Sequence, residues 1–239
     1  MAVIDARGMG FEELGQRLRA TEGDVVIDGC LGQRFIAAGM RERTVEIHGT
    51  PGNALGAYLD GAHVEVFGNA QDAVGDTMNA GTIVVRGNTG DTAGYAMRGG
   101  SIYVAGNAGY RAGIHMKQYQ DRVPTLVIGG RAGSFLGEYQ AGGLIIVLGL
   151  GNDGPIVGNF PCTGMHGGQL VLRSNCSGIR FPSQVTVRPA SPEDMVSIAR
   201  HVETFCSLFG YASDDVLDGP FSVVTPDSSN PYTQMYVAN

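Results

Sequence analysis

Two residue types that often act in catalysis, cysteine and histidine, come together in one segment of this sequence. Cys162 precedes His166 by four residues in LGNDGPIVGNFPCTGMHGG, residues 150–168. A thiol and an imidazole so placed could form a nucleophile and its base, or, with His115, part of a metal site. Neither set is complete, because no nearby acid would orient the base and no ligand set reaches four. We therefore predict no catalytic residue and no metal site in this chain.

A glycine-rich stretch is the second candidate for chemistry, because it looks suited to cradle a phosphate. Residues 87–100 read GNTGDTAGYAMRGG. Phosphate-binding loops of this kind connect a strand to a helix whose N-terminal amides meet the phosphate. No helical pattern follows this stretch or its copies elsewhere in the chain. We predict that the glycines build a structural wall and that the chain binds no cofactor.

The glycine-rich copies belong to a repeat that runs through most of the chain. Short apolar runs begin at intervals of 19, 19, 19, 24, 19 and 25 residues. A fixed period of this size is typical of a solenoid, and insertions of five or six residues explain the longer intervals. The first residues of the runs are Thr44, His63, Thr82, Ser101, Thr125, Leu144 and Gln169.

Apolar residues alternate within each run, as at Val64 and Val66, and this alternation predicts strands. A repeat of 19 residues is too short for a βαβ unit, which takes about thirty residues. Glycine at every third or fourth position would cost a helix about 1 kcal/mol each. We therefore predict a mainly β fold, a single-stranded right-handed parallel β-helix of about seven coils with a short helix at each end.

The glycines of most units keep a spacing of three and then four residues, but in one unit Gln71 stands between Gly68 and Gly75 in place of the middle glycine. We expect them at coil corners, where the backbone needs positive φ or leaves no room for a Cβ atom. Asn69, Asn88 and Asn107 each follow the first glycine of a unit and predict a ladder of amide hydrogen bonds along the axis. The predicted structural glycines are Gly49, Gly52, Gly56, Gly68, Gly75, Gly87, Gly90, Gly94, Gly106, Gly109, Gly113, Gly130, Gly133 and Gly137.

Helices are predicted at both ends, where a solenoid would otherwise expose unpaired strand edges. Residues 11–18 carry an apolar stripe before a degenerate first coil. Residues 191–194 have the sequence of an N-cap with a capping box, and Gly210 is a natural helix stop. The expected units are a β-helix domain with its N-terminal capping helix, residues 1–185, and a C-terminal helix and extended tail, residues 186–239, both packed on that domain.

A docking surface is expected on the later coils. The outer strand positions change from charged residues, such as Glu46 and Glu65, to apolar ones, such as Val127 and Ile146. The first insertion, residues 114–124, the second insertion, residues 150–168, and the tail, residues 223–239, add aromatic residues, methionines and arginine, which interface cores favour. The alternative is that these residues cover the chain's own strands. The predicted partner-contact residues are Met116, Tyr119, Arg122, Phe160, Met165, Tyr232, Met235 and Tyr236.

Composition narrows the classes of partner and compartment. The formal net charge of −7 argues against nucleic acid or a membrane surface, since either would need a clustered basic face. The first residues lack a signal-peptide pattern and no run approaches the roughly 18 apolar residues of a membrane span, so we expect a cytoplasmic protein. The four cysteines lack CxxC spacing and fit reduced packing residues. They are Cys30, Cys162, Cys176 and Cys206.

Several segments resemble one family. HGTPGNALGAYLDG, GNAQDAVGDTMNAG, GDTAGYAMRGG and GEYQAGGLIIVLGL, with their glycine spacing, are similar to the GXGXG family over about residues 1–235. That family includes the C-terminal β-helix domain of the glutamate synthase large subunit and its stand-alone versions. It also includes the C subunits of formylmethanofuran dehydrogenase and of the formyltransferase/hydrolase complex. The segments RAGIHMK, GGRAGSFLGEYQAGG, CTGMHGG and SSNPY most resemble the stand-alone glutamate synthase domain, domain 3.

This resemblance implies a non-catalytic structural subunit of a glutamate synthase-type complex, an oxidoreductase assembly of glutamate biosynthesis. Its partners would be a separate amidotransferase subunit and a flavin synthase subunit, and the latter would carry FMN and an iron–sulfur cluster. No family catalytic residue can be transferred. The amidotransferase of glutamate synthase uses an N-terminal cysteine as its nucleophile, whereas the second residue here is Ala2. No cysteine spacing in this chain suits an iron–sulfur cluster. Self-association into a homo-oligomer stays open.

Two alternatives come from other classes of function. The chain could be the C subunit of a formylmethanofuran dehydrogenase or formyltransferase/hydrolase-type complex that holds a metal-dependent amidohydrolase partner. It could also be an independent β-helix enzyme that uses the loop of Cys162 and His166. The two scaffold hypotheses differ in their partners, whereas the third predicts activity of the isolated chain.

Overall fold

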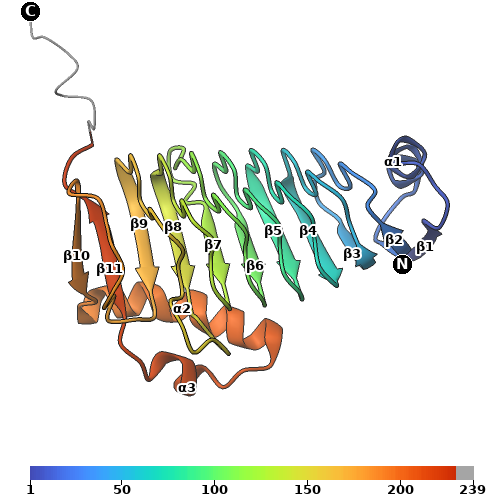
Figure 1. Ribbon diagram of the computed structural model, residues 1–239. Coiled ribbons are helices and arrows are strands. Elements are labelled where there is room, and N and C mark those ends of the chain that lie inside the picture. Colours follow the sequence, from blue (N-terminus) through green and yellow to red (C-terminus); the bar gives the residue numbers. More distant parts are fainter. Residues whose placement is uncertain (230–239) are drawn as a thin grey trace, which may run out of the picture.

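The computed structural model describes residues 1–229, which form a long β-helix with one helix at its N-terminal end and another along one face (Figure 1). Most of the regular structure is strand. The elements in chain order are β1 (Ala2–Asp5), α1 (Phe11–Ala20), β2 (Val25–Leu31), β3 (Thr44–Thr50), β4 (Asp60–Phe67), β5 (Ala80–Val85), β6 (Ser101–Val104), β7 (Thr125–Ile128), β8 (Ala141–Val147), β9 (Gly167–Leu172), β10 (Val185–Pro189), α2 (Pro192–Phe209), α3 (Ser213–Leu217) and β11 (Ser222–Pro226).

Strands β1 to β9 are parallel neighbours in chain order, so each coil adds one strand to a single sheet. The first residues of the predicted repeats lie opposite one another, as where Thr44 pairs with His63 and His63 with Thr82. The same register continues through the strands that begin with the later repeats. The β-helix has about eight turns, close to the number predicted, and the repeat period is confirmed as the pairing register.

The core is a column of apolar side chains that point into the β-helix. Val64, Ile83, Ile102, Leu126 and Ile145 are paired in successive strands and each is fully buried. Burying one such side chain contributes about 1.5–3 kcal/mol, so a column repeated over every coil provides the main stabilising free energy.

The turns between strands contain alternate residues with positive φ. In one turn these are Arg111 (φ 56°), Gly113 (φ 69°) and His115 (φ 55°). A Cβ atom on Gly113 would collide with the side chain of Ile145, whereas Arg111 and His115 are exposed. Glycine is therefore needed at the middle position, where no side chain fits. Each of the fourteen predicted structural glycines has either positive φ or no room for a Cβ atom.

The N-terminal end of the core is closed by α1, as predicted. Leu14 and Leu18 are buried against it. Strand β1 was not predicted, although it pairs with β2 at the edge of the sheet. Its four residues contain a single buried side chain, Ile4, and such a short segment shows no recognisable alternation.

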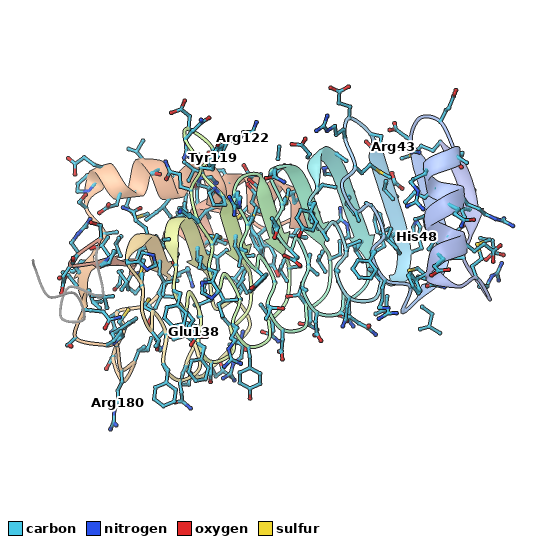
Figure 2. The ribbon with its side chains drawn as sticks, turned by 90° about the horizontal axis from the view of Figure 1, so that it is seen from above. Arg43, His48, Tyr119, Arg122, Glu138 and Arg180 are labelled. Atoms are coloured by element: carbon cyan, nitrogen blue, oxygen red, sulfur yellow. The ribbon has the colours of Figure 1, made fainter. Side chains whose placement is uncertain are left out.

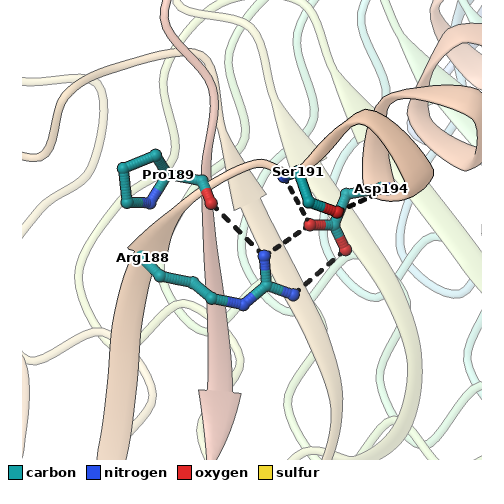
Figure 3. Close-up of polar contacts among 4 residues, drawn as sticks. All are labelled: Arg188, Pro189, Ser191 and Asp194. Atoms are coloured by element: carbon teal, nitrogen blue, oxygen red, sulfur yellow. Dashed lines mark hydrogen bonds and ion pairs between the residues drawn. The ribbon is translucent and has the colours of Figure 1, made fainter.

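Helix α2 begins and ends at the predicted residues. The Ser191 hydroxyl accepts a hydrogen bond from the Asp194 backbone N–H (3.2 Å), and the Asp194 carboxylate accepts one from the Ser191 N–H (2.7 Å). Arg188 of β10 donates to the same carboxylate and to the Pro189 carbonyl (Figure 3). This arginine holds the pKa of Asp194 well below its usual range. Gly210 then ends the helix in the left-handed conformation.

The position of α2 differs from the prediction. It does not close the C-terminal end of the solenoid but lies along the outer face of the later strands (Figure 1). Its buried Val202 and Phe205 belong to a second apolar cluster with the outward-facing Tyr103, Val127 and Ile146. The apolar outer face that we expected a partner to cover is therefore covered here by the chain's own helix.

The last two strands, β10 and β11, were also not predicted. They join the same sheet, β11 antiparallel to β9 and β10 antiparallel to β11. The boundary between the two units at residue 185 stays a prediction, and the tail residues 230–239 lie outside the described residues.

Candidate functional site

The glycine-rich turns carry the predicted ladder of asparagine side chains. The Oδ1 of Asn69 accepts a hydrogen bond from the backbone N–H of Asn88 (2.8 Å), and the Oδ1 of Asn88 accepts one from that of Asn107 (2.7 Å). The Asn107 oxygen accepts from the backbone N–H of Arg131 (2.8 Å). Each asparagine side chain thus supports the backbone of the next coil.

A second ladder of carboxylates runs beside the first. The Oδ1 of Asp72 accepts from the backbone N–H of Asp91 (2.9 Å), and the Oδ1 of Asp91 accepts from that of Tyr110 (2.8 Å). This ladder was not predicted. The two aspartates do lie 19 residues apart, at the same position of successive repeats, so the signal was present.

The ladders explain why the following coil needs glycine. A Cβ atom on Gly106 would collide with the Oδ1 of Asn88, and one on Gly109 would collide with the Oδ1 of Asp91. The ladder side chain occupies the space that a Cβ atom would need. A ladder side chain in one coil therefore requires glycine at the adjacent position of the next coil.

The same hydrogen bonds decide whether the loop could hold a phosphate. All five backbone N–H groups of residues 88–92 donate to acceptors in neighbouring coils. Among them, the N–H of Thr89 reaches the Asn107 carbonyl (2.9 Å) and that of Thr92 reaches the Tyr110 carbonyl (2.7 Å). A phosphate loop needs N–H groups that point at the ligand. In this stretch the donors are already used within the wall.

Cys162 and His166 are not arranged as a nucleophile and base. Burial in the core raises the pKa of the Cys162 thiol to about 12, so the thiol is protonated near neutral pH. The Nδ1 of His166 lies 3.0 Å from the carbonyl oxygen of Gly164. Within residues 1–229 the thiol and the imidazole form no hydrogen bond with each other. The geometry thus gives no support to the enzyme hypothesis for this loop.

We expect Cys162 to resist alkylation by iodoacetamide in the folded protein at pH 8. At four pH units below its pKa, roughly one thiol in ten thousand is a thiolate, and the group is also buried. Half-buried Cys176 is the internal control and should react faster. Peptide mass spectrometry over time, with full labelling in urea, measures both rates. Rapid labelling of Cys162 ahead of Cys176 would show an activated thiol.

His115 lies at the turn edge among aromatic rings rather than metal ligands. Its ring stacks on Tyr139 at 5.2 Å between centroids and meets Tyr95 edge-on at 6.0 Å. Within the described part of the chain, no three side chains of His, Cys, Asp or Glu gather as a metal site would require. Nor does any helix in residues 1–229 have the length and apolar character to cross a bilayer.

Met116 and Met165 were predicted to touch a partner, and this prediction is wrong, because both side chains are buried in the core. Met78, Met97 and Met116 follow one another at intervals of 19 residues and are fully buried. A flexible methionine therefore fills the same core position in successive coils. The repeat interval itself contained the signal that assigns Met116 to the core.

Tyr119 and Arg122 are exposed, as a partner contact requires. They face each other across a tight hairpin in the first insertion, with backbone hydrogen bonds of 3.2 and 3.1 Å. Figure 2 shows both at one edge of the molecule, with Glu138 at the opposite edge. Contact with a partner stays a prediction for these two residues.

Phe160 is also exposed, but it belongs to the edge of Glu138. Its ring stacks on Phe135 at 5.3 Å, and the Arg111 guanidinium lies over Phe135 while pairing with Glu138 at 3.0 Å. The structure therefore divides the exposed candidates between two edges instead of joining them in one surface. The remaining candidates, Tyr232, Met235 and Tyr236, lie outside the described residues.

Comparison with known proteins gives one relative of similar length. Uncharacterized protein MJ1350 of Methanocaldococcus jannaschii is 41% identical over 249 residues, which cover 98% of this chain and 95% of the relative. The alignment therefore spans the whole repeat array of this chain.

A solved structure shows the same fold at lower identity. A chain of the formyltransferase/hydrolase complex FhcABCD from Methylorubrum extorquens, in complex with methylofuran, superposes with a TM-score of 0.63. It is 21% identical, and the match covers 85% of this chain and 73% of that chain. At this identity the likeness establishes the β-helix fold.

The family assignment rests on the glycine repeat itself. The pattern of the GXGXG motif family matches residues 19–223, from the end of α1 to β11. This range contains the coils, the ladders and the outer helix. The chain belongs to the GXGXG motif family.

Proposed function

We propose that this chain is a non-catalytic structural subunit of a multi-subunit enzyme complex. The observation that carries the proposal is that every backbone N–H of residues 88–92, the stretch that looked suited to cradle a phosphate, donates to a neighbouring coil. A rigid β-helix with exposed residues at two edges is suited to hold partner proteins in place. The cytoplasm is the proposed compartment.

A formyltransferase/hydrolase-type complex is the favoured assembly. The supporting observation is the likeness to a chain of the complex that contains methylofuran, over most of both chains. In such an assembly this chain would take the role of the C subunit and hold a catalytic partner, which would supply any metal or cofactor.

A glutamate synthase-type complex is the second candidate. The observation in its favour is the sequence resemblance of RAGIHMK, GGRAGSFLGEYQAGG and CTGMHGG to the stand-alone domain of that enzyme. Here the partners would be an amidotransferase subunit and a subunit with FMN and an iron–sulfur cluster. The two candidates therefore differ in partners that can be identified directly.

We expect the tagged chain, purified from its native host, to bring down enzyme subunits at a constant ratio. Mass spectrometry of these subunits distinguishes formyl-transfer and hydrolase proteins from amidotransferase and flavin proteins. Tyr119→Ala and Phe160→Ala alter opposite edges of the β-helix, and the variant that weakens recovery several-fold identifies the docking edge.

Tyr58→Ala is the matched control, because this tyrosine is similarly exposed at 59% but lies on an early coil. It should leave recovery and thermal midpoint unchanged. Recovery of all three variants at the wild-type level would remove both edges as docking sites. Recovery of the chain alone would count against the complex itself.

A further inference from the structure

A cleft at the C-terminal end of the β-helix is not explained by the scaffold role. Its volume is about 430 Å³, within the range of small-molecule sites. It lies between the turn of the second insertion, which contributes Val157, Asn159 and Phe160, and the segment after β9, which contributes Ile179 and Arg180. Arg131, from the preceding coil, also lines the cleft.

The charge of the cleft is opposite to that of the chain. The two charged residues in its lining are Arg131 and Arg180, and no carboxylate of the described residues lines it, in a chain of net charge −7. Neither guanidinium forms an ion pair or side-chain hydrogen bond within residues 1–229. By contrast, nearby Arg111 is paired with Glu138. The cleft is therefore lined by two positively charged arginine side chains whose N–H donors, within the described part of the chain, are free to bind a ligand.

The walls place these cations beside apolar and aromatic surface. Phe160 exposes 62% of its surface, and Val157 and Ile179 provide the apolar lining. The backbone at Arg131 is held in place, since its N–H donates to Asn107 at the end of the asparagine ladder (2.8 Å). The N–H of Asn159 likewise donates to the Ser134 hydroxyl (3.0 Å).

We infer that this cleft binds a small ligand that has an oxyanion group, carboxylate or phosphate, attached to a planar ring or apolar body. Guanidinium groups match both oxyanions through paired N–H donors. The side-chain amide of Asn159 adds a further donor group, and the exposed Phe160 ring offers a stacking face for the body of the ligand. Binding of such a ligand to the cleft does not depend on which enzyme complex the chain belongs to.

The test uses three probes that share a ring and differ in charge: phenyl phosphate, benzoate and benzyl alcohol. We expect at least one anion to bind the full-length chain in a calorimetric or NMR titration, and benzyl alcohol not to bind. Which anion binds distinguishes a phosphate ligand from a carboxylate ligand. Arg131→Gln and Arg180→Gln should each weaken that binding about tenfold or more.

Arg98→Gln is the control, because Arg98 is also an exposed arginine without an ion pair in the described residues, but it lies outside the cleft. It should leave the affinity unchanged, and all three variants should keep the wild-type thermal midpoint. Failure of both anions to bind at concentrations up to about 10 mM would overturn the inference. Equal binding of benzyl alcohol, or an unchanged affinity in both cleft variants, would overturn it as well.

Discussion

Replacing Gly109 with alanine is expected to destabilise the β-helix by about 3 kcal/mol or more. The new Cβ atom would lie 2.8 Å from the carbonyl carbon and oxygen of Gly90 and would collide with the Oδ1 of Asp91. Those atoms belong to a backbone and a ladder that cannot move without shifting the neighbouring coil. Thermal unfolding should show the midpoint lowered by roughly 6–12 °C.

Alanine substitutions at two other glycines distinguish the free-energy cost of a steric collision from the cost of backbone strain. Gly94→Ala introduces a side chain at φ +73° with only ordinary contacts, so its cost should be about 1 kcal/mol. Gly154→Ala meets no heavy atom within 4 Å and has no positive φ, so the midpoint should stay unchanged. If Gly109→Ala proved as stable as Gly154→Ala, the stacked-coil explanation of the glycines would be wrong.

Replacing Phe205 with alanine is expected to cost about 3–5 kcal/mol in the free energy of unfolding. Phe205 is fully buried between α2 and the sheet and packs with Phe209 at 4.7 Å and Tyr211 at 5.8 Å. Its loss would leave a cavity in the cluster that covers the outer face. Urea unfolding followed by circular dichroism measures the change.

Val196→Ala is the control on the same helix, because Val196 is 76% exposed. It should change the free energy of unfolding by less than about 0.5 kcal/mol. A similarly small effect of Phe205→Ala would mean that α2 is not held on the sheet, and the later strands would then be free for a partner.

The repeat fold could be predicted because one physical rule acts on every coil. Parallel strands stacked in register require equivalent residues at a fixed interval, and the run that begins at Thr44 therefore aligns with those at His63 and Thr82. The asparagine ladder follows from the same register. Each repeat confirmed the others, which a single motif cannot do.

Elements that occur once were harder to predict. The caps of α2 are local, so Ser191 and Asp194 fixed where the helix begins, but its place on the outer face depends on contacts with distant strands. Strand β1 has only four residues, and β10 and β11 pair across longer separations than the repeat interval. Their pairing follows from the assembled β-helix rather than from their own pattern.

The predictions of partner-contact residues were wrong where they relied on residue type instead of position in the repeat. Met116 and Met165 have the residue type that interfaces favour, yet their repeat position points them into the core. The arginine cleft was missed because Arg131 and Arg180 are 49 residues apart, and only the closing coils bring them into one lining. The position of a residue in the coil predicts where its side chain lies better than its residue type does.

The central claim, that this chain serves as a structural subunit of a larger enzyme complex, is tested most directly by native mass spectrometry of the chain purified from its host. The chain has a mass of 25.0 kDa. We predict an assembly in which this mass occurs with those of different subunits at a fixed stoichiometry. Spectra that contain only the 25.0 kDa chain and its multiples, from a preparation gentle enough to keep other complexes intact, would contradict the claim.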